Sequence, residues 1–230
     1  MDKVFKFVLA FLLIPLVVAF VAVAGQMLLH DVPWGELQWA LIGMMGYVLV
    51  YPLIRTNNLQ FVEIFEHELG HMVTYLGVFY RLKNFHVFPE EREHYVSAYR
   101  SGIPGVGWLT KLAPYFLPVF TIPLLLLHFV LPEQFIPALD FAIGLSLGFH
   151  FVALSREFRP IQTDLTEQTM FFSAVFTIFA NTMLVMIIIG VLTRDSALLL
   201  EYLQTAAGQA GTYYTEIFDW LRTQDFAAML

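Results

Sequence analysis

The chain contains two histidines and a glutamate with H-E-x-x-H spacing, in the segment from Phe65 to His71 that reads Phe-Glu-His-Glu-Leu-Gly-His. Residues four apart lie on one face of a helix, so the rings of His67 and His71 can bind the same metal ion. Glu68 lies beside them, where its carboxylate can accept a proton from a zinc-bound water. The chain has no cysteine, which leaves histidine and carboxylate as the strong ligands. The motif therefore predicts a hydrolytic Zn²⁺ site.

A catalytic zinc site needs a third protein ligand and keeps a fourth position for water. Asp164 follows Pro160 in a connector between two apolar segments, and it can reach the histidines if that connector returns to their side of the membrane. His150 is the alternative ligand; if it does not bind the metal, it would support the ligands or stabilise a transition-state oxyanion. We favour Asp164, with Gln162 as a neighbouring hydrogen-bond donor.

Two further carboxylates, Glu63 and Glu66, lie on the same two turns as the motif. An ionisable side chain that faces lipid costs about 2.5 to 3.5 kcal/mol, so these groups need partners inside the protein. They would either hold the imidazole rings from behind or line a channel that brings water to the metal. The sequence leaves both roles open.

The elements that must position these residues are apolar helices. With 58% hydrophobic and 13% charged residues, the chain is typical of an integral membrane protein in contact with the lipid bilayer. Its formal net charge of -7 argues against nucleic-acid binding. We expect an all-α fold with about six transmembrane helices: two in residues 1–56, four in a core of residues 57–193, and an amphipathic tail at 194–230. The six apolar segments are 4–24, 37–54, 57–80, 108–131, 132–154 and 168–192.

The insert at residues 81–107 has the composition of a small β-hairpin. Aromatic and β-branched residues flank a charged segment at 89–93 that would form its tip. A free strand edge there could hold an unwound substrate peptide through backbone hydrogen bonds. The candidate residues for this alignment are Phe85, Val87, Val96 and Ala98.

Taken together, the motifs resemble those of site-two-protease-type intramembrane zinc metallopeptidases, over about Asn57 to Val191. The resemblance implies a buried zinc held by His67, His71 and an aspartate on a later helix, with Glu68 activating water. Asp164 is followed by leucine, whereas better-known members have glycine there, so the chain resembles a divergent branch. The supporting segments are Phe65 to His71, Gly102-Ile103-Pro104-Gly105, Leu112-Ala113-Pro114-Tyr115, Gly148-Phe149-His150 and Gln162-Thr163-Asp164.

The basic residues in the loops predict the orientation of the chain in the membrane, and the composition of the C-terminal segment predicts where that segment lies. We count seven basic residues on the active-site side of a six-helix topology and five on the other, which favours a cytoplasmic active site in a bacterial-type inner membrane. This multi-pass topology puts both termini on the opposite side. The tail, with apolar residues between Tyr213 and Leu221, is expected to lie outside the core and to bind the membrane surface or a protein partner.

These patterns favour an intramembrane zinc endopeptidase that cleaves a membrane protein in or near its transmembrane segment. The alternative is a non-proteolytic scaffold or binding protein that retains the zinc site. A metal transporter is less favoured, because transport does not need Glu68 at this spacing and only one strong histidine pair is present.

Overall fold

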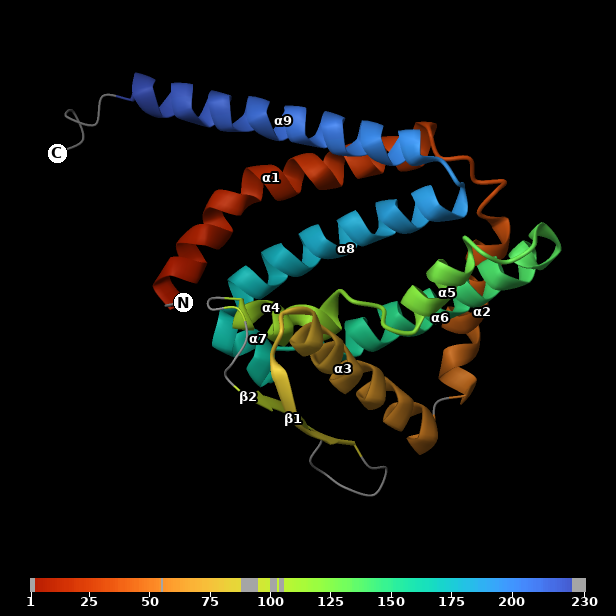
Figure 1. Cartoon of the computed structure of the whole chain (residues 1–230). Helices are drawn as coiled ribbons and strands as arrows, with labels where there is room; N and C mark the ends of the chain where they lie inside the picture. Colours follow the sequence, from red (N-terminus) through yellow and green to blue (C-terminus); the bar gives the residue numbers. More distant parts are fainter. Residues whose placement is uncertain (1–2, 55, 88–94, 100–102, 104–105, 225–230) are drawn as a thin grey trace.

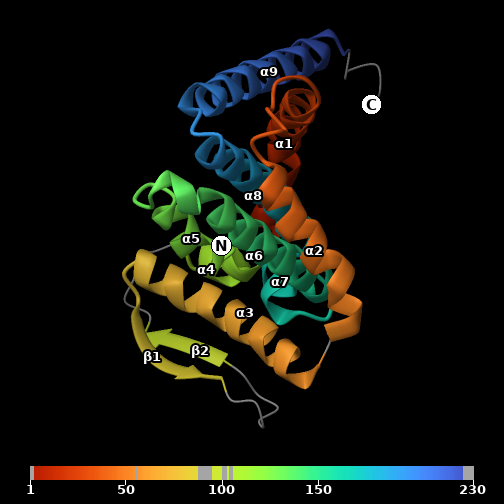
Figure 2. The ribbon, with the colours of Figure 1, turned by 90° about the vertical axis from the view of Figure 1, so that its right-hand side faces the viewer.

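The structure is a computed structural model that describes residues 3–54, 56–87, 95–99, 103 and 106–224, and it is mostly helical (Figure 1). One small antiparallel sheet lies on the outer side of helix α3, far from the C-terminal helix α9, in both views (Figures 1 and 2). The elements are α1 (Lys3–His30), α2 (Gln38–Ile54), α3 (Asn57–Gly77), β1 (Arg81–His86), β2 (Tyr95–Tyr99), α4 (Gly107–Leu112), the short 3-10 turn η1 (Ala113–Tyr115), α5 (Thr121–Leu127), the 3-10 turn η2 (Glu133–Phe135), α6 (Ile136–Glu157), α7 (Thr163–Gln168), α8 (Met170–Leu192) and α9 (Ser196–Thr223).

Three helical segments in the described residues are long and apolar enough to cross a membrane: Lys3–His30, Glu133–Glu157 and Met170–Leu192. These correspond to three of the six predicted spans. Helix α2 is apolar but shorter, with 17 residues. The predicted span at 108–131 is divided into α4, η1 and α5, because Pro114 and Pro118 cannot donate the backbone hydrogen bonds of a continuous helix.

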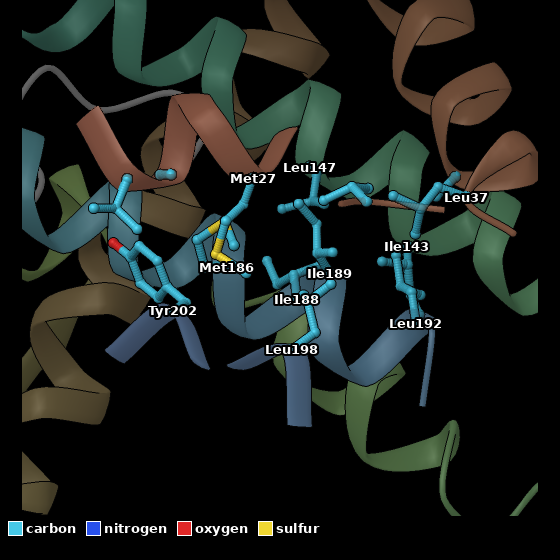
Figure 3. Close-up of a cluster of buried hydrophobic side chains, with 14 of the residues drawn as sticks. Met27, Leu37, Ile143, Leu147, Met186, Ile188, Ile189, Leu192, Leu198 and Tyr202 are labelled. Carbon is cyan, nitrogen blue, oxygen red and sulfur yellow. The ribbon is translucent and has the colours of Figure 1, made fainter. Parts of the chain in front are cut away.

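Helices α1, α8 and α9 share one apolar core with α6. In Figure 3, Met27 of α1 and Leu147 of α6 lie close to Met186 and Ile188 of α8. Figure 3 also shows Tyr202 of α9 in this cluster, where its hydroxyl donates a hydrogen bond to the carbonyl oxygen of Phe20. The first half of α9 is therefore part of the core. This corrects the expectation that the whole tail lies outside it.

Helices α2 and α6 pack closely because glycines replace side chains where they meet. A Cβ atom placed on Gly144 would lie 1.8 Å from the carbonyl oxygen of Ala40, and one on Gly43 would lie 2.1 Å from that of Phe141. Only a residue without a Cβ permits such an approach. This contact fixes α2 against the helix that leads into the connector with Asp164.

The N-terminal end of α1 lies beside α7, at the end of the molecule that carries Asp164. The buried ammonium of Lys6 donates hydrogen bonds to the side chain of Gln168 and the carbonyl oxygen of Glu167. Helix α9 runs back along α1, with the Tyr214 hydroxyl donating to the carbonyl oxygen of Leu12. Both ends of the described chain therefore lie toward the Asp164 end. This corrects the expectation that the termini lie opposite it.

Candidate metal centre

Helix α3 carries the H-E-x-x-H motif, and the turn η1 packs against this helix at Gly70. The helix begins after Thr56, whose hydroxyl accepts a hydrogen bond from the backbone N–H of Leu59. A Cβ atom on Gly70 would lie 3.2 Å from the Cα of Pro114, so the glycine between Glu68 and His71 lets η1 pack directly on the motif. The turn that precedes α5 is thereby placed beside the histidines.

His67, His71 and Asp164 converge on one point, as the sequence predicts. The Nε2 atoms of His67 and His71 lie 3.7 Å and 3.2 Å from Asp164 Oδ2. Among the described residues, these three form the group of histidine and acidic side chains that could hold a metal ion, with ligand atoms within 4.8 Å of one another. Ligands at 2.0 to 2.2 Å around a tetrahedral zinc are about 3.4 Å apart, so the separations fit such an ion.

The Nδ1 atom of each imidazole, which points away from Asp164, forms a hydrogen bond. Nδ1 of His67 lies 2.6 Å from Glu157 Oε2, and Nδ1 of His71 lies 2.7 Å from the carbonyl oxygen of Thr110. Both oxygens accept hydrogen bonds, so each Nδ1 carries the proton, and Nε2 faces Asp164 with either a second proton or a cation between them. Carboxylate or carbonyl partners behind the ring are the usual support of metal-binding histidines.

Three carboxylates and one ammonium surround the site. Asp164, Glu157 and Glu68 contribute three negative charges, and Lys111 contributes one positive charge, with its Nζ 3.0 Å from Asp164 Oδ1. With neutral imidazoles, the net charge of these four groups is minus two. One divalent cation, or two protons on the rings, would balance it. The donor set of two nitrogens and one oxygen is that of a catalytic zinc site.

Asp164 is held in its ionised form by its neighbours. Burial by itself raises the pKa of this carboxyl, but hydrogen bonds with His67 and His71 and the charge of Lys111 outweigh burial and hold the pKa well below its usual range. Its helix, α7, has six residues, and Lys6 binds that helix at its other end. Asp164 is therefore an anion at neutral pH, as a metal ligand must be.

Glu68 is buried on α3 beside the triad. The fully buried Tyr115 of η1 packs its ring edge-on against His67, with ring centroids 5.4 Å apart. His67 thus contacts Tyr115 through its ring and Glu157 through its Nδ1. A proton acceptor and a hydroxyl donor thus lie beside the candidate ligands.

The other polar candidates lie on a different side of α3. Glu66 Oε1 is 3.4 Å from Nδ1 of His150, and Glu63 forms an ion pair with Arg156. His150 is therefore directed to Glu66, and the structure does not bring it to the triad. The imidazoles are held from behind by Glu157 and by the Thr110 carbonyl, so Glu63 and Glu66 do not serve as the predicted supports. The channel alternative for these two remains a prediction.

Gln162 is the residue before the first turn of α7, and in the described part of the chain its side chain makes no hydrogen bond to the triad. It lies two residues from Asp164 along the chain. Its predicted role as a hydrogen-bond donor to the site remains a prediction.

The substrate-alignment candidates lie in or beside the two-stranded sheet. Strands β1 and β2 pair antiparallel, with Phe85 opposite Val96 and Leu82 opposite Ala98. Val87 follows the end of β1, and the predicted charged tip at 89–93 lies outside the described residues, as does most of the glycine-rich segment 102–105. The ring of Phe85 packs on Phe65 of α3, with centroids 6.0 Å apart. The sheet is thus attached two residues before His67.

Four groups at the site were not identified from sequence: Glu157, Lys111, Tyr115 and the Thr110 carbonyl. The rule that a metal-binding histidine needs a partner for its second nitrogen predicts that some acceptor exists. With 19 acidic residues in the chain, that rule could not single out Glu157.

Comparisons of the chain with protein families, with curated proteins and with solved structures gave no match.

Proposed function

We propose that this protein is a zinc endopeptidase of the intramembrane, site-two-protease type, which hydrolyses a peptide bond in or near a transmembrane segment of another protein. The observation that carries the proposal is the convergence of the two Nε2 atoms on Asp164 Oδ2, 3.2 and 3.7 Å away, with both Nδ1 atoms engaged. Glu68 occupies the position from which a carboxylate serves hydrolysis in H-E-x-x-H sites.

The residues divide the chemistry between them. His67, His71 and Asp164 would hold Zn²⁺, which when bound polarises a carbonyl group and acidifies water. Glu68 accepts the proton as the water oxygen attacks the carbonyl carbon, and then delivers that proton to the leaving amine nitrogen. Glu157 and the Thr110 carbonyl keep the two rings in the orientation that directs Nε2 toward the ligand position.

A membrane substrate is supported by the apolar helices around the site. Three of them are long enough to span a bilayer, and many apolar side chains of α1 and α2 are exposed, such as Leu53 at 84%. A helical substrate has no free backbone groups, so it must unwind before cleavage. We propose that the β1–β2 sheet, attached to α3 at Phe65, receives the unwound peptide along a strand edge. Membrane crossings beyond these three, and the hairpin tip, belong to this proposal.

Basic residues support a cytoplasmic site in a multi-pass protein of a bacterial-type inner membrane. Lys6 and Lys111 contact α7, while Arg156 and Arg159 lie at the end of α6 that leads into α7. At the opposite end, Arg194 lies 3.7 Å from Glu133. Lysine and arginine favour the cytoplasmic side of a membrane. The described basic residues toward the site include Lys3, Lys6, Lys111, Arg156, Arg159 and Arg222. Arg81 and Lys83 lie in β1, and Arg194 lies at the other end.

The test compares wild type with Glu68→Gln, using zinc content and cleavage of a panel of single-span membrane proteins. We expect one zinc per chain in both proteins and cleavage by wild type alone. Glu201→Gln, at an exposed position on α9, is the matched control and should cleave normally. His67→Ala should lose the zinc.

Two outcomes would contradict the proposal. Folded wild-type protein without zinc would remove the metal centre. Zinc in wild type with equal cleavage, or with none, in wild type and Glu68→Gln would favour the scaffold alternative, because a scaffold does not need the proton acceptor.

A further inference from the structure

Tyr115 has a buried hydroxyl group without a partner. The residue is 0% exposed, and its hydroxyl oxygen makes no hydrogen bond within the described part of the chain. Buried hydroxyls in proteins are nearly always paired, so an unpaired one at a functional site needs an explanation. A group that binds it only during the reaction is one such explanation.

The surroundings of this hydroxyl are those of the candidate metal centre. The Tyr115 ring packs edge-on against His67, at 87°, and against Phe158, at 89° with centroids 5.7 Å apart. The carboxylates of Asp164, Glu157 and Glu68 all act on it electrostatically. The ring that carries this hydroxyl therefore borders a candidate metal ligand.

The backbone of Tyr115 is anchored by a neighbouring helix. Nδ2 of Asn181, in α8, donates hydrogen bonds to the carbonyl oxygen of Tyr115 at 2.8 Å and to that of Thr177 at 2.9 Å. Leu112 and Ala113, which precede Tyr115, are both 0% exposed. A phenol fixed at both its backbone and its ring loses little freedom when it binds a ligand, which is the condition for efficient transition-state stabilisation.

Two other candidate donors near the site have acidic neighbours. His150, the sequence-based candidate for stabilising an oxyanion, is directed to Glu66. The Lys111 ammonium is shared between Asp164 and Glu167. Among the described residues, His150 Nε2 is also buried without a hydrogen-bond partner, but His150 packs toward Glu66, whereas the ring of Tyr115 contacts the candidate ligand His67.

We propose that Tyr115 is a catalytic residue whose hydroxyl donates a hydrogen bond to the oxyanion of the tetrahedral intermediate. This inference rests on the proposed peptidase function. Attack of the water oxygen forms the new C–O bond, moves the carbonyl π electrons onto oxygen, and transfers the water proton to Glu68. The phenol holds that oxyanion and keeps its own proton. When the C–N bond breaks, the electrons return to the carbonyl, and Glu68 protonates the amine.

The variant that isolates the hydroxyl is Tyr115→Phe, because it keeps the ring contacts with His67 and Phe158. We expect unchanged zinc content and thermal stability close to wild type. The kcat should fall about 100-fold or more with little change in KM, the loss typical of removing one oxyanion donor. Tyr202→Phe, which removes a buried hydroxyl in the core around α9, is the control and should retain wild-type kcat.

Binding of a tetrahedral mimic gives a readout that does not depend on turnover. The probe is a polyleucine transmembrane peptide with one phosphinate in place of a peptide bond, compared with the unmodified peptide. Wild type should prefer the phosphinate, and Tyr115→Phe should lose about 100-fold of that preference with unchanged affinity for the parent peptide. Incorporating 3-fluorotyrosine at position 115, which keeps the hydroxyl, should restore it.

The outcomes distinguish a failure of the proposed role of Tyr115 from a failure of the proposed peptidase function. If Tyr115→Phe retains the wild-type preference for the phosphinate, the role of Tyr115 is refuted while the peptidase proposal stands. If zinc-loaded wild type shows no preference, or wild type binds no zinc, the peptidase proposal fails and this inference fails with it. If Tyr115→Phe loses zinc or unfolds, the fluorotyrosine protein decides, because fluorine makes the phenol a stronger hydrogen-bond donor: a phosphinate preference above that of wild type supports the role, and an equal or lower preference overturns it.

Discussion

His67 is held from behind by a carboxylate, and this contact leads to a prediction about metal affinity. Glu157 Oε2 lies 2.6 Å from its Nδ1. Glutamine at position 157 would keep the shape of the side chain but remove the charge that fixes the ring and increases its basicity. We expect Glu157→Gln to bind zinc about 10- to 100-fold more weakly, as measured by competition with a chelator.

Glu201→Gln, on the exposed side of α9, is the control for this measurement and should match wild type. Equal zinc affinity in wild type and Glu157→Gln would show that the carboxylate does not support the imidazole. Thermal unfolding of both variants would establish that the protein remains folded.

At the scale of single residues, the sequence predicts the ligands better than their supports. The spacing of His67 and His71 defines a helix face, and the proline before Asp164 predicts a connector that returns to them. Glu157 and Tyr115 reach the same site from segments 90 and 48 residues away from His67 in sequence. The direction of such side chains depends on tertiary packing, which no local pattern encodes.

At the scale of the elements, the α2–α6 contact leads to a prediction about stability. A Cβ atom on Gly144 would lie 1.8 Å from the carbonyl oxygen of Ala40, and a backbone atom cannot rotate away. The two helices must therefore separate. We expect Gly144→Ala to destabilise the protein by about 1 to 3 kcal/mol, measured as a lower midpoint of thermal unfolding in detergent.

Gly208→Ala is the matched control, because no atom lies within 4 Å of a Cβ at this position in α9. Alanine has a higher helix propensity than glycine, so this variant should gain up to about 1 kcal/mol. A Gly144→Ala protein that unfolds at or above the wild-type temperature would contradict the packing argument.

Element boundaries follow the sequence closely in α8, whereas α1 continues six residues beyond the predicted end of its apolar segment, to His30. The sequence also predicts that the proline-rich segment at 108–131 is kinked or broken. It could not predict that η1 would pack against the motif helix, because that contact depends on Gly70 meeting Pro114. The docking of α9 was missed because its apolar face suits a membrane surface, a partner or α1 equally well.

At the scale of the whole molecule, the arrangement of α1 leads to a prediction about topology. Lys6 binds α7, so the N-terminal end should share a membrane side with the Asp164 connector, and Glu133 should lie on the other side. The chain has no cysteine, so single cysteines can be labelled without background. An impermeant maleimide added to intact spheroplasts should label Glu133→Cys but neither Lys3→Cys nor Glu167→Cys.

Labelling of all three variants after membrane disruption is the control for thiol accessibility. The uniform six-helix topology predicts a different result, in which Lys3→Cys and Glu133→Cys share one side and Glu167→Cys lies on the other. That pattern would refute the arrangement of α1 described above.

The six-helix prediction places the termini opposite the Asp164 end because it counts every apolar segment as a full crossing, whereas in the structure both ends of the described chain lie toward that end. Helix α3 has the length of a span, but Glu63 meets Arg156 and His71 meets Asp164, and both partners lie at the same end of the molecule. The position of a helix with this many ionisable groups is set by the polar partners that those groups contact. If α3 is counted as a membrane crossing, every segment before it is assigned to the opposite side of the membrane.

Lys111 divides the two oxygens of Asp164 between different partners. Its ammonium lies 3.0 Å from Oδ1, while Oδ2 faces the two histidines. A carboxylate held in this way can offer a cation one oxygen but not both. If the site holds zinc, the lysine would limit Asp164 to one ligand oxygen and so leave a position open for a reactant, and a residue that touches no metal would then decide whether the centre is structural or reactive.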